Sequence, residues 1–296
     1  MRPVEIVALA GFVAALVLQQ VFTVPGLTRV AIGLNDSAHG TWFALVLLAL
    51  LVVVSRRWRL GVRAELALGA AAALVLAPGT ELVQELTGRD AEVDDALFDL
   101  VGAVGALAVW AAYRKRLSVR VAATITVMAF VVSLYPIFSA LRIDHYRDSL
   151  APKLIDFESP RYRWFVESTS NLVQVPAPDA WQQERGRTVL RIDLDADRYP
   201  GMLLHEPIVD WTPYRALVIA AFVPDAQPMP FGVSVRFWTN RARNAYWPYE
   251  LTPGANTLRV PLDARFDPSR GVSTLVLYSS ASASGRSLYL GEIHLE

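Results

Sequence analysis

The chain has 296 residues, of which 53% are hydrophobic and 19% charged, and its 28 basic and 28 acidic side chains leave a formal net charge of zero. This profile is typical of a membrane protein, and the lack of a basic cluster outside short loops argues against nucleic-acid binding, which needs a surface that neutralises phosphates. The absence of cysteine excludes disulfides, thiolate nucleophiles and cysteine-ligated zinc, but it does not identify the compartment.

The composition changes abruptly along the chain. Residues up to about 140 are nearly all aliphatic, whereas the rest carry most of the Trp, Tyr and Pro and many alternating polar positions. We therefore expect a multi-domain protein: an α-helical transmembrane bundle of five helices at residues 1–140, a linker at residues 141–152 and an all-β sandwich at residues 153–296.

A membrane-spanning helix needs roughly 20 apolar residues. The five candidates are residues 4–24, 38–54, 64–82, 96–113 and 119–138. The first is too long for the apolar region of a signal peptide, and no Ala-x-Ala cleavage pattern follows it, so we interpret it as a helix.

Positive charge is concentrated in two of the four loops, and such charge marks the cytoplasmic side of a membrane protein. The second loop holds Arg56, Arg57, Arg59 and Arg63, and the fourth holds Arg114, Lys115, Arg116 and Arg120, whereas the other two offer only Arg29 and Arg89. Five spans then place the N-terminus in the cytoplasm. We expect a multi-pass protein of the cytoplasmic (inner) membrane whose C-terminal domain is extracytoplasmic, in the periplasm or at the cell exterior.

Polar side chains interrupt the third and fourth apolar segments near the predicted outer surface. A carboxylate inside the hydrocarbon costs about 2.5 to 3.5 kcal/mol and usually faces the bundle interior or a watery cavity. Helical spacing stacks these side chains on one face of each helix. We expect a pocket in which Arg89 pairs with the acids and His39 takes part in proton transfer or hydrogen bonding. Its candidate residues are His39, Glu81, Gln84, Arg89, Glu92, Asp95, Asp99 and Gly102.

The spacing of these residues is similar to the pattern E-x-x-Q followed by G-R-x-x-D-x-x-D-x-x-x-N-x-x-G of the VanZ-like family, and the resemblance covers about residues 1–140. It implies a bacterial cell-envelope protein of a family linked to glycopeptide antibiotic resistance. The sequence departs from the family at Glu92 and Asp99, where the pattern has Asp and Asn. The Asp and Lys that precede the family's histidine are also absent before His39.

The polar residues allow three interpretations: hydrogen bonds that hold helices together, a site for a ligand or lipid headgroup, or a catalytic site. Intramembrane hydrogen bonds contribute on the order of 1 kcal/mol each without any ligand. One histidine with several carboxylates suits a divalent ion, but no His-x-x-x-His or similar spacing is present. We therefore predict no metal site from the sequence.

Beyond residue 142 the sequence consists of short alternating segments bounded by Pro and Gly, which indicates antiparallel strands. Strands are predicted at residues 154–158, 188–194, 217–223, 231–238, 245–251, 257–262, 273–279 and 287–295. A region of roughly 145 residues with this many strands fits one sandwich or jelly roll. Trp211 and Tyr214 are expected in its core.

Five short stretches, at residues 155–158, 199–201, 210–214, 254–258 and 288–293, are similar to galactose-binding-like modules of the carbohydrate-binding kind. This resemblance implies a jelly-roll sandwich that often binds glycans and holds a structural calcium; no other cofactor is expected. Sugar recognition combines aromatic faces with amide and guanidinium groups. The candidate glycan-binding residues are Arg236, Trp238, Asn240, Asn244, Tyr246 and Trp247.

Three functions remain open. The preferred one is a binding protein whose membrane pocket holds a lipid-linked or wall-related ligand while the sandwich contacts an envelope glycan. The second is an acid/base enzyme acting on an envelope lipid or precursor, with Glu81 or Asp95 as base, His39 as proton carrier and Arg89 stabilising an anion. No nucleophile motif accompanies it, so no catalytic residue is assigned and an enzyme is not favoured. The third is a structural tether for an exterior interaction domain.

Overall fold

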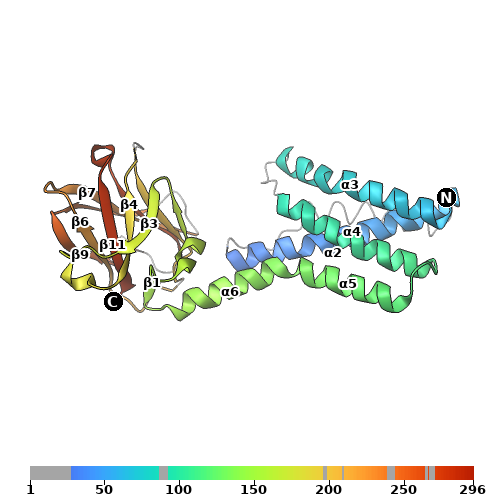
Figure 1. Cartoon of the computed structure of the whole chain (residues 1–296), viewed down its shortest axis with the longest axis horizontal. Coiled ribbons are helices and arrows are strands. Elements are labelled where there is room, and N and C mark those ends of the chain that lie inside the picture. The colour runs from blue at the N-terminus through green and yellow to red at the C-terminus, as the bar shows by residue number, and fades with distance from the viewer. Residues whose placement is uncertain are drawn as a thin grey trace. The chain divides into compact units, whose positions relative to one another are not determined.

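The computed structural model describes residues 28–86, 93–195, 199–208, 210–238, 244–263, 266 and 271–296. The chain divides into two compact units, Met1–Arg142 and Ile143–Glu296, the first helical and the second mostly strands (Figure 1). The helix predicted at residues 4–24 lies outside the described residues.

The described helices of the first unit form a bundle around α4. They are α2 (Arg29–Trp58), α3 (Val62–Leu86), α4 (Val93–Tyr113), α5 (Val119–Ser133) and the beginning of α6 (Tyr135–Ser149). Helix α4 packs against α2, α3 and α5. Among the described helices, α2, α3 and α4 are long and apolar enough to cross a membrane, and the bent pair α5–α6 would make a fourth span. Unlike the prediction, α2 begins at Arg29, so His39 lies about three turns inside it.

Two glycines bring α2 and α4 into backbone contact. A side chain at Gly102 would collide with the carbonyl oxygen of Gly40, and one at Gly40 would collide with the Ser133 hydroxyl. Small residues allow such close approach between membrane helices, which adds van der Waals contact where no hydrophobic force drives association. The contact sets the distance between His39, which precedes Gly40, and Asp99, one turn before Gly102.

The last predicted span is broken in the structure. Residues 119–138 were expected to form one helix, but α5 ends at Ser133 and α6 continues at an angle of 40°. Pro136 explains the break, because it has no N–H for the carbonyl of Val132 and its ring would clash there. The amide of Ile137 instead donates to Ser37 Oγ at 3.0 Å. Helix α6 then runs to Ser149, so most of the expected linker is helical.

The second unit contains eleven described strands and three short 3-10 helices. The strands are β1 (Lys153–Ile155), β2 (Val166–Ser168), β3 (Asn171–Pro176), β4 (Thr188–Asp193), β5 (Gly201–His205), β6 (Ala216–Val223), β7 (Met229–Phe237), β8 (Ala245–Leu251), β9 (Gly254–Pro261), β10 (Val272–Ser279) and β11 (Ser287–Leu295). The 3-10 helices are η1 (Pro160–Trp164), η2 (Gln182–Glu184) and η4 (Ala281–Ala283).

The strands form two antiparallel sheets that enclose one core, as expected for a sandwich. One sheet has the order β3-β4-β11-β6-β9 with β1 paired to β11, and the other has the order β2-β5-β10-β7-β8. Trp211 is buried in the core as predicted, stacks on Phe266 at 5.4 Å and donates its indole N–H to the carbonyl of Ile208. Strands β2, β3 and β5 were not predicted; β2 has only three residues, and β5 begins with the glycine of a Tyr-Pro-Gly stretch that resembles a turn.

The contact between α2 and α4 predicts unequal effects of two glycine substitutions. Gly102→Ala should lower the free energy of unfolding by at least about 1 to 3 kcal/mol, because the methyl group must push two backbones apart. Thermal unfolding of the full chain in detergent measures this. Gly79→Ala in α3 is the control, since a methyl group there meets nothing within 4 Å and should cause no loss. Equal destabilisation by Gly102→Ala and Gly79→Ala would contradict the close contact between α2 and α4 at Gly102.

Candidate functional site

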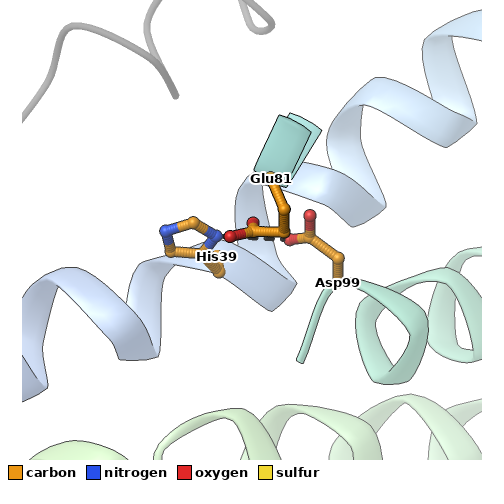
Figure 2. Close-up of side chains that lie close together, drawn as sticks. All are labelled: His39, Glu81 and Asp99. Carbon is orange, nitrogen blue, oxygen red and sulfur yellow. Dashed lines mark ion pairs between the residues drawn. The ribbon is translucent and has the colours of Figure 1, made fainter. Parts of the chain in front are cut away.

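A cluster of buried polar side chains lies where α2, α3 and α4 meet. His39 comes from α2, Glu81 and Gln84 from α3, and Asp95 and Asp99 from α4. Asp99 is fully buried, and His39 and Glu81 are only 5% and 7% exposed. Figure 2 shows His39, Glu81 and Asp99 pointing toward one another from three helices. We call His39, Glu81, Asp95 and Asp99 the acidic–histidine cluster.

The imidazole of His39 bridges two carboxylates of α4. Its Nε2 lies 3.3 Å from Asp95 Oδ2, and its Nδ1 lies 3.6 Å from Asp99 Oδ1. Asp95 and Asp99 are four residues apart on one face of α4, so both reach the same ring. Burial removes these groups from water, which makes their mutual arrangement energetically important.

Thr80 joins the cluster although the sequence did not indicate it. Its hydroxyl lies 2.7 Å from the carbonyl of Ala77 and 3.3 Å from Asp99 Oδ2. It follows Pro78 and Gly79 in α3, where a polar residue inside an apolar helix was the available signal. The single hydroxyl proton is shared between these two acceptors, and the contact with Asp99 is the longer one.

The structure brings most of the predicted membrane pocket together. His39, Glu81, Gln84, Asp95 and Asp99 are all buried at one end of the bundle, and Gly102 lies one turn from Asp99 in the contact with α2. Arg89 and Glu92 lie outside the described residues. The expected pairing of Arg89 with the acids therefore stays a prediction.

An apolar cavity of about 220 Å³ adjoins this cluster. Helices α2, α4 and α5 line it, and its wall includes Gly40 and Gly102, the two glycines that set the position of the cluster. Phe130, Leu45 and Val109 contribute apolar surface. The cavity thus lies beside the glycine contact, and its lining includes none of the four cluster residues.

A second buried acid occupies the opposite end of α3 and was not predicted. Glu65 is 0% exposed, accepts a hydrogen bond from Trp110 Nε1 at 3.1 Å and pairs with Arg114 at 3.1 Å. No role was assigned to it from the sequence, because a single glutamate beside Arg63 at the edge of an apolar segment forms no recognisable pattern. The ion pair brings the two arginine-rich loops to the same end of the bundle.

Three tyrosines gather on the outer face of the five-stranded sheet of the second unit. Tyr278 of β10 faces Gly201 on one neighbouring strand and Gly232 on the other. A Cβ at Gly232 would lie 2.7 Å from Tyr278 Cζ, so the ring rests directly on the sheet. Tyr246 lies nearly parallel to it at 6.2 Å, and Tyr199 meets it edge-on at 5.5 Å. We call Tyr199, Tyr246 and Tyr278 the tyrosine platform.

The platform combines accessible rings with a fixed central one. Tyr199 and Tyr246 are 55% and 46% exposed, whereas Tyr278 is half-buried. Burial and a hydrogen bond with Tyr246 raise the pKa of Tyr278 to about 12. The phenol of Tyr278 would be protonated at physiological pH even at the ordinary tyrosine pKa of about 10, so the shift does not change its charge there.

The predicted glycan-binding residues fall into different environments. Tyr246 and Arg236 are exposed on the face of the tyrosine platform, and Asn244 is exposed just before β8. Trp238 is half-buried after the end of β7. Trp247 is 3% exposed and packs in the core, so its prediction as a glycan-binding residue is wrong: Tyr246 and Trp247 are adjacent in a strand and point to opposite faces.

Asn240 lies outside the residues that the structure describes. Tyr199 and Tyr278 were not among the predicted glycan-binding residues, because each stands alone among small or aliphatic neighbours. The alternation in residues 273–279 could have placed Tyr278 on the outer face, but only strand pairing shows that it meets Tyr246.

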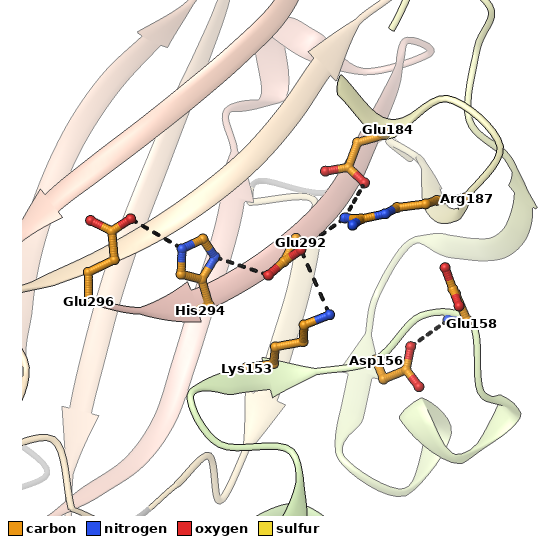
Figure 3. A network of polar contacts seen from close by, with 8 residues as sticks. All are labelled: Lys153, Asp156, Glu158, Glu184, Arg187, Glu292, His294 and Glu296. Atoms are coloured by element: carbon orange, nitrogen blue, oxygen red, sulfur yellow. Dashed lines mark hydrogen bonds and ion pairs between the residues drawn. The ribbon is translucent and has the colours of Figure 1, made fainter. Parts of the chain in front are cut away.

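The other sheet carries a charged network beside a cavity of about 420 Å³ (Figure 3). Arg187 lies 3.3 Å from Glu184 and 2.9 Å from Glu292, and Lys153 and His294 also approach Glu292. These acids are thus engaged with basic side chains. Within the described ranges, only His39, Glu81 and Asp99 form a group of three metal-ligand types in close proximity. The calcium expected in the sandwich stays a prediction.

Comparison with known proteins gives structural similarity without a family. No family model matches the chain, and no curated protein matches it. An exo-β-agarase structure is similar at 10% identity with a TM-score of 0.42, covering 49% of this chain and 25% of the agarase. This chain thus spans about a quarter of the agarase's length.

Carbohydrate-binding modules are among the other similar structures. A xylan-binding domain of family 22 from Paenibacillus barcinonensis matches at 14% identity and a TM-score of 0.31, covering 44% of this chain and 89% of the module. The family 11 module of a cellulosomal cellulase of Clostridium thermocellum matches at 13% identity and a TM-score of 0.30, covering 44% and 84%.

Proposed function

We propose that the chain is a multi-pass membrane protein of the bacterial cell envelope that presents a glycan-binding β-sandwich outside the cytoplasm. The tyrosine platform is the observation that carries the proposal. Aromatic rings contribute large contact areas with specific geometry, and their faces suit the C–H surfaces of sugar rings. Tyr278 is held in place by the glycine beneath it, so binding needs little reorganisation of the central ring.

Polar groups surround the platform on the same face. Arg236 and Asn244 supply guanidinium and amide donors, and His205 forms a 2.8 Å contact with Glu167 across β5 and β2. A few polar groups around an aromatic surface are typical of small-molecule and sugar recognition. Because Tyr199 and Tyr246 are exposed, the platform is better suited to binding a polysaccharide chain along its side than to enclosing a single sugar.

This proposal predicts selective losses of glycan binding in the purified full chain. Tyr199→Ala and Tyr246→Ala should each weaken binding to an envelope polysaccharide identified on a glycan array by about 2- to 10-fold, the loss expected for one aromatic contact of about 0.5 to 1.5 kcal/mol. Titration calorimetry measures the affinities. Tyr289→Ala is the control, because it removes a ring from the outer face of the other sheet. Binding to no polysaccharide, or an equal loss in the control, would contradict the proposal.

The helical unit supports a membrane location and an orientation. Three described helices, or four with the bent pair, are long and apolar enough to span a bilayer. The Glu65–Arg114 ion pair places both arginine-rich loops at one end, which we assign to the cytoplasm because positive charge is retained there. The sandwich then lies on the extracytoplasmic side.

Reporter fusions test this orientation. Alkaline phosphatase fused after Glu296 should be active, because that enzyme folds only outside the cytoplasm. A fusion after Arg116, in the loop between α4 and α5, is the matched control and should be inactive. The reverse pattern of phosphatase activity would contradict this membrane orientation.

The acidic–histidine cluster supports a second part of the proposal, a lipid-linked or wall-related ligand of the envelope. The nearby cavity is apolar and is lined in part by Gly40 and Gly102, which follow His39 and Asp99 along α2 and α4. An amphiphile could place its polar end at the cluster and part of a hydrocarbon chain in the cavity. The VanZ-like spacing of residues 81–102 makes a link to glycopeptide resistance part of this proposal.

Native mass spectrometry of the full chain tests this part. The wild type should retain a lipid-linked species after mild solubilisation, and Thr41→Trp should release most of it, because Thr41 lies on the wall of the cavity and is exposed. Thr124→Trp is the control, an exposed threonine of α5 away from the cavity. Detergent as the sole bound amphiphile in the wild type would rule the ligand out.

A further inference from the structure

Donor atoms of three side chains converge in the acidic–histidine cluster. One ligand atom each from His39, Glu81 and Asp99 lies within 4.8 Å of the other two, and all three residues are buried (Figure 2). They come from three different helices, so their convergence is a property of the packed bundle. The sequence indicated a pocket that contains these residues, but it predicted no metal site.

The two nitrogens of His39 face different partners. Nε2 lies 3.3 Å from Asp95 Oδ2, close enough for its N–H to donate to that carboxylate, and this leaves the lone pair on Nδ1. Nδ1 points at Asp99 Oδ1 from 3.6 Å, which is too long for a hydrogen bond. Among the described residues Nδ1 has no hydrogen-bond partner, although His39 is only 5% exposed.

That separation matches two ligands of one metal ion. With metal–ligand bonds of about 2.0 to 2.2 Å, two ligands of a tetrahedral ion lie roughly 3.3 to 3.6 Å apart. The third donor lies within 4.8 Å, so binding would draw Glu81 inward by side-chain rotation. Metal-bound histidines also commonly donate their other N–H to a carboxylate, which is the position of Asp95.

We propose that His39 Nδ1, Glu81 and Asp99 bind a divalent first-row transition ion, with Asp95 orienting the imidazole from outside. One imidazole and two carboxylates suit Zn²⁺, Fe²⁺ or Mn²⁺ rather than the all-oxygen sites of Mg²⁺ or Ca²⁺. Three protein ligands leave a position open for water or a ligand oxygen. The site is independent of glycan binding by the sandwich and does not require a lipid in the cavity.

The same geometry has one competing explanation, a doubly protonated His39 that forms ion pairs with Asp95 and Asp99. In that case the cluster is a structural hydrogen-bond network and has no specific affinity for a metal. A metal site would bind an ion stoichiometrically and lose it when a ligand residue is replaced. A structural ion-pair network would do neither.

Metal titration of the full chain in detergent, after chelator treatment, tests the proposal with Zn²⁺ and Mn²⁺ as probes. The wild type should bind about one ion per chain, and that ion should raise the thermal midpoint. Asp99→Asn and Glu81→Gln should abolish stoichiometric binding. Asp95→Asn should retain the ion with an affinity reduced about 10- to 100-fold, because Asp95 acts through His39.

Glu65→Gln is the matched control for Glu81→Gln. Glu65 is also a buried glutamate of α3, but it lies at the other end of the bundle, so its replacement should leave metal binding unchanged. A wild type that binds neither ion overturns the proposal, as does an Asp99→Asn variant that binds normally or a control that loses the ion. Where a ligand variant fails to fold, the shift of the wild-type midpoint and the visible absorption of bound Co²⁺ still decide the question. Glycan binding is measured separately, so the two proposals fail independently.

Discussion

The helical unit depends on the close contact between α2 and α4 at Gly40 and Gly102. Neither glycine can carry a side chain without a collision, so the two backbones pack at a distance that larger residues would forbid. This contact holds His39 near Asp95 and Asp99, and it also shapes the apolar cavity next to them. Gly40 and Gly102, which have no side chains, therefore help to position the site residues His39, Asp95 and Asp99 on α2 and α4.

The buried charges at the two ends of the bundle are arranged differently. Glu65 has an arginine and an indole N–H as partners, which is a self-contained arrangement for a buried acid. The acidic–histidine cluster instead gathers three carboxylates around one imidazole. An arrangement of this kind is suited to a cation or a polar ligand, whereas the Glu65 pair is suited to holding α3 against α4.

A glycine plays a comparable role in the sandwich. Gly232 lets the ring of Tyr278 lie flat on the sheet, and strand pairing then brings Tyr246 alongside it. In both units the functional geometry follows from a missing side chain on a neighbouring element. The missing side chain acts differently in the two units: it allows two helix backbones to approach closely at Gly40 and Gly102, and it leaves room for an aromatic ring over Gly232.

The sequence by itself determined the helical and β regions, most strand positions and the facing stripes on α3 and α4, because these depend on local periodicity and hydropathy. It also indicated His39, Glu81, Asp95 and Asp99 as site residues. Only the tertiary structure decided that α2 begins at Arg29, that Glu65 pairs with Arg114 and that Trp247 faces the core. It alone joined Tyr199, Tyr246 and Tyr278, since contacts between residues distant in sequence depend on register and helix packing, which no local pattern encodes.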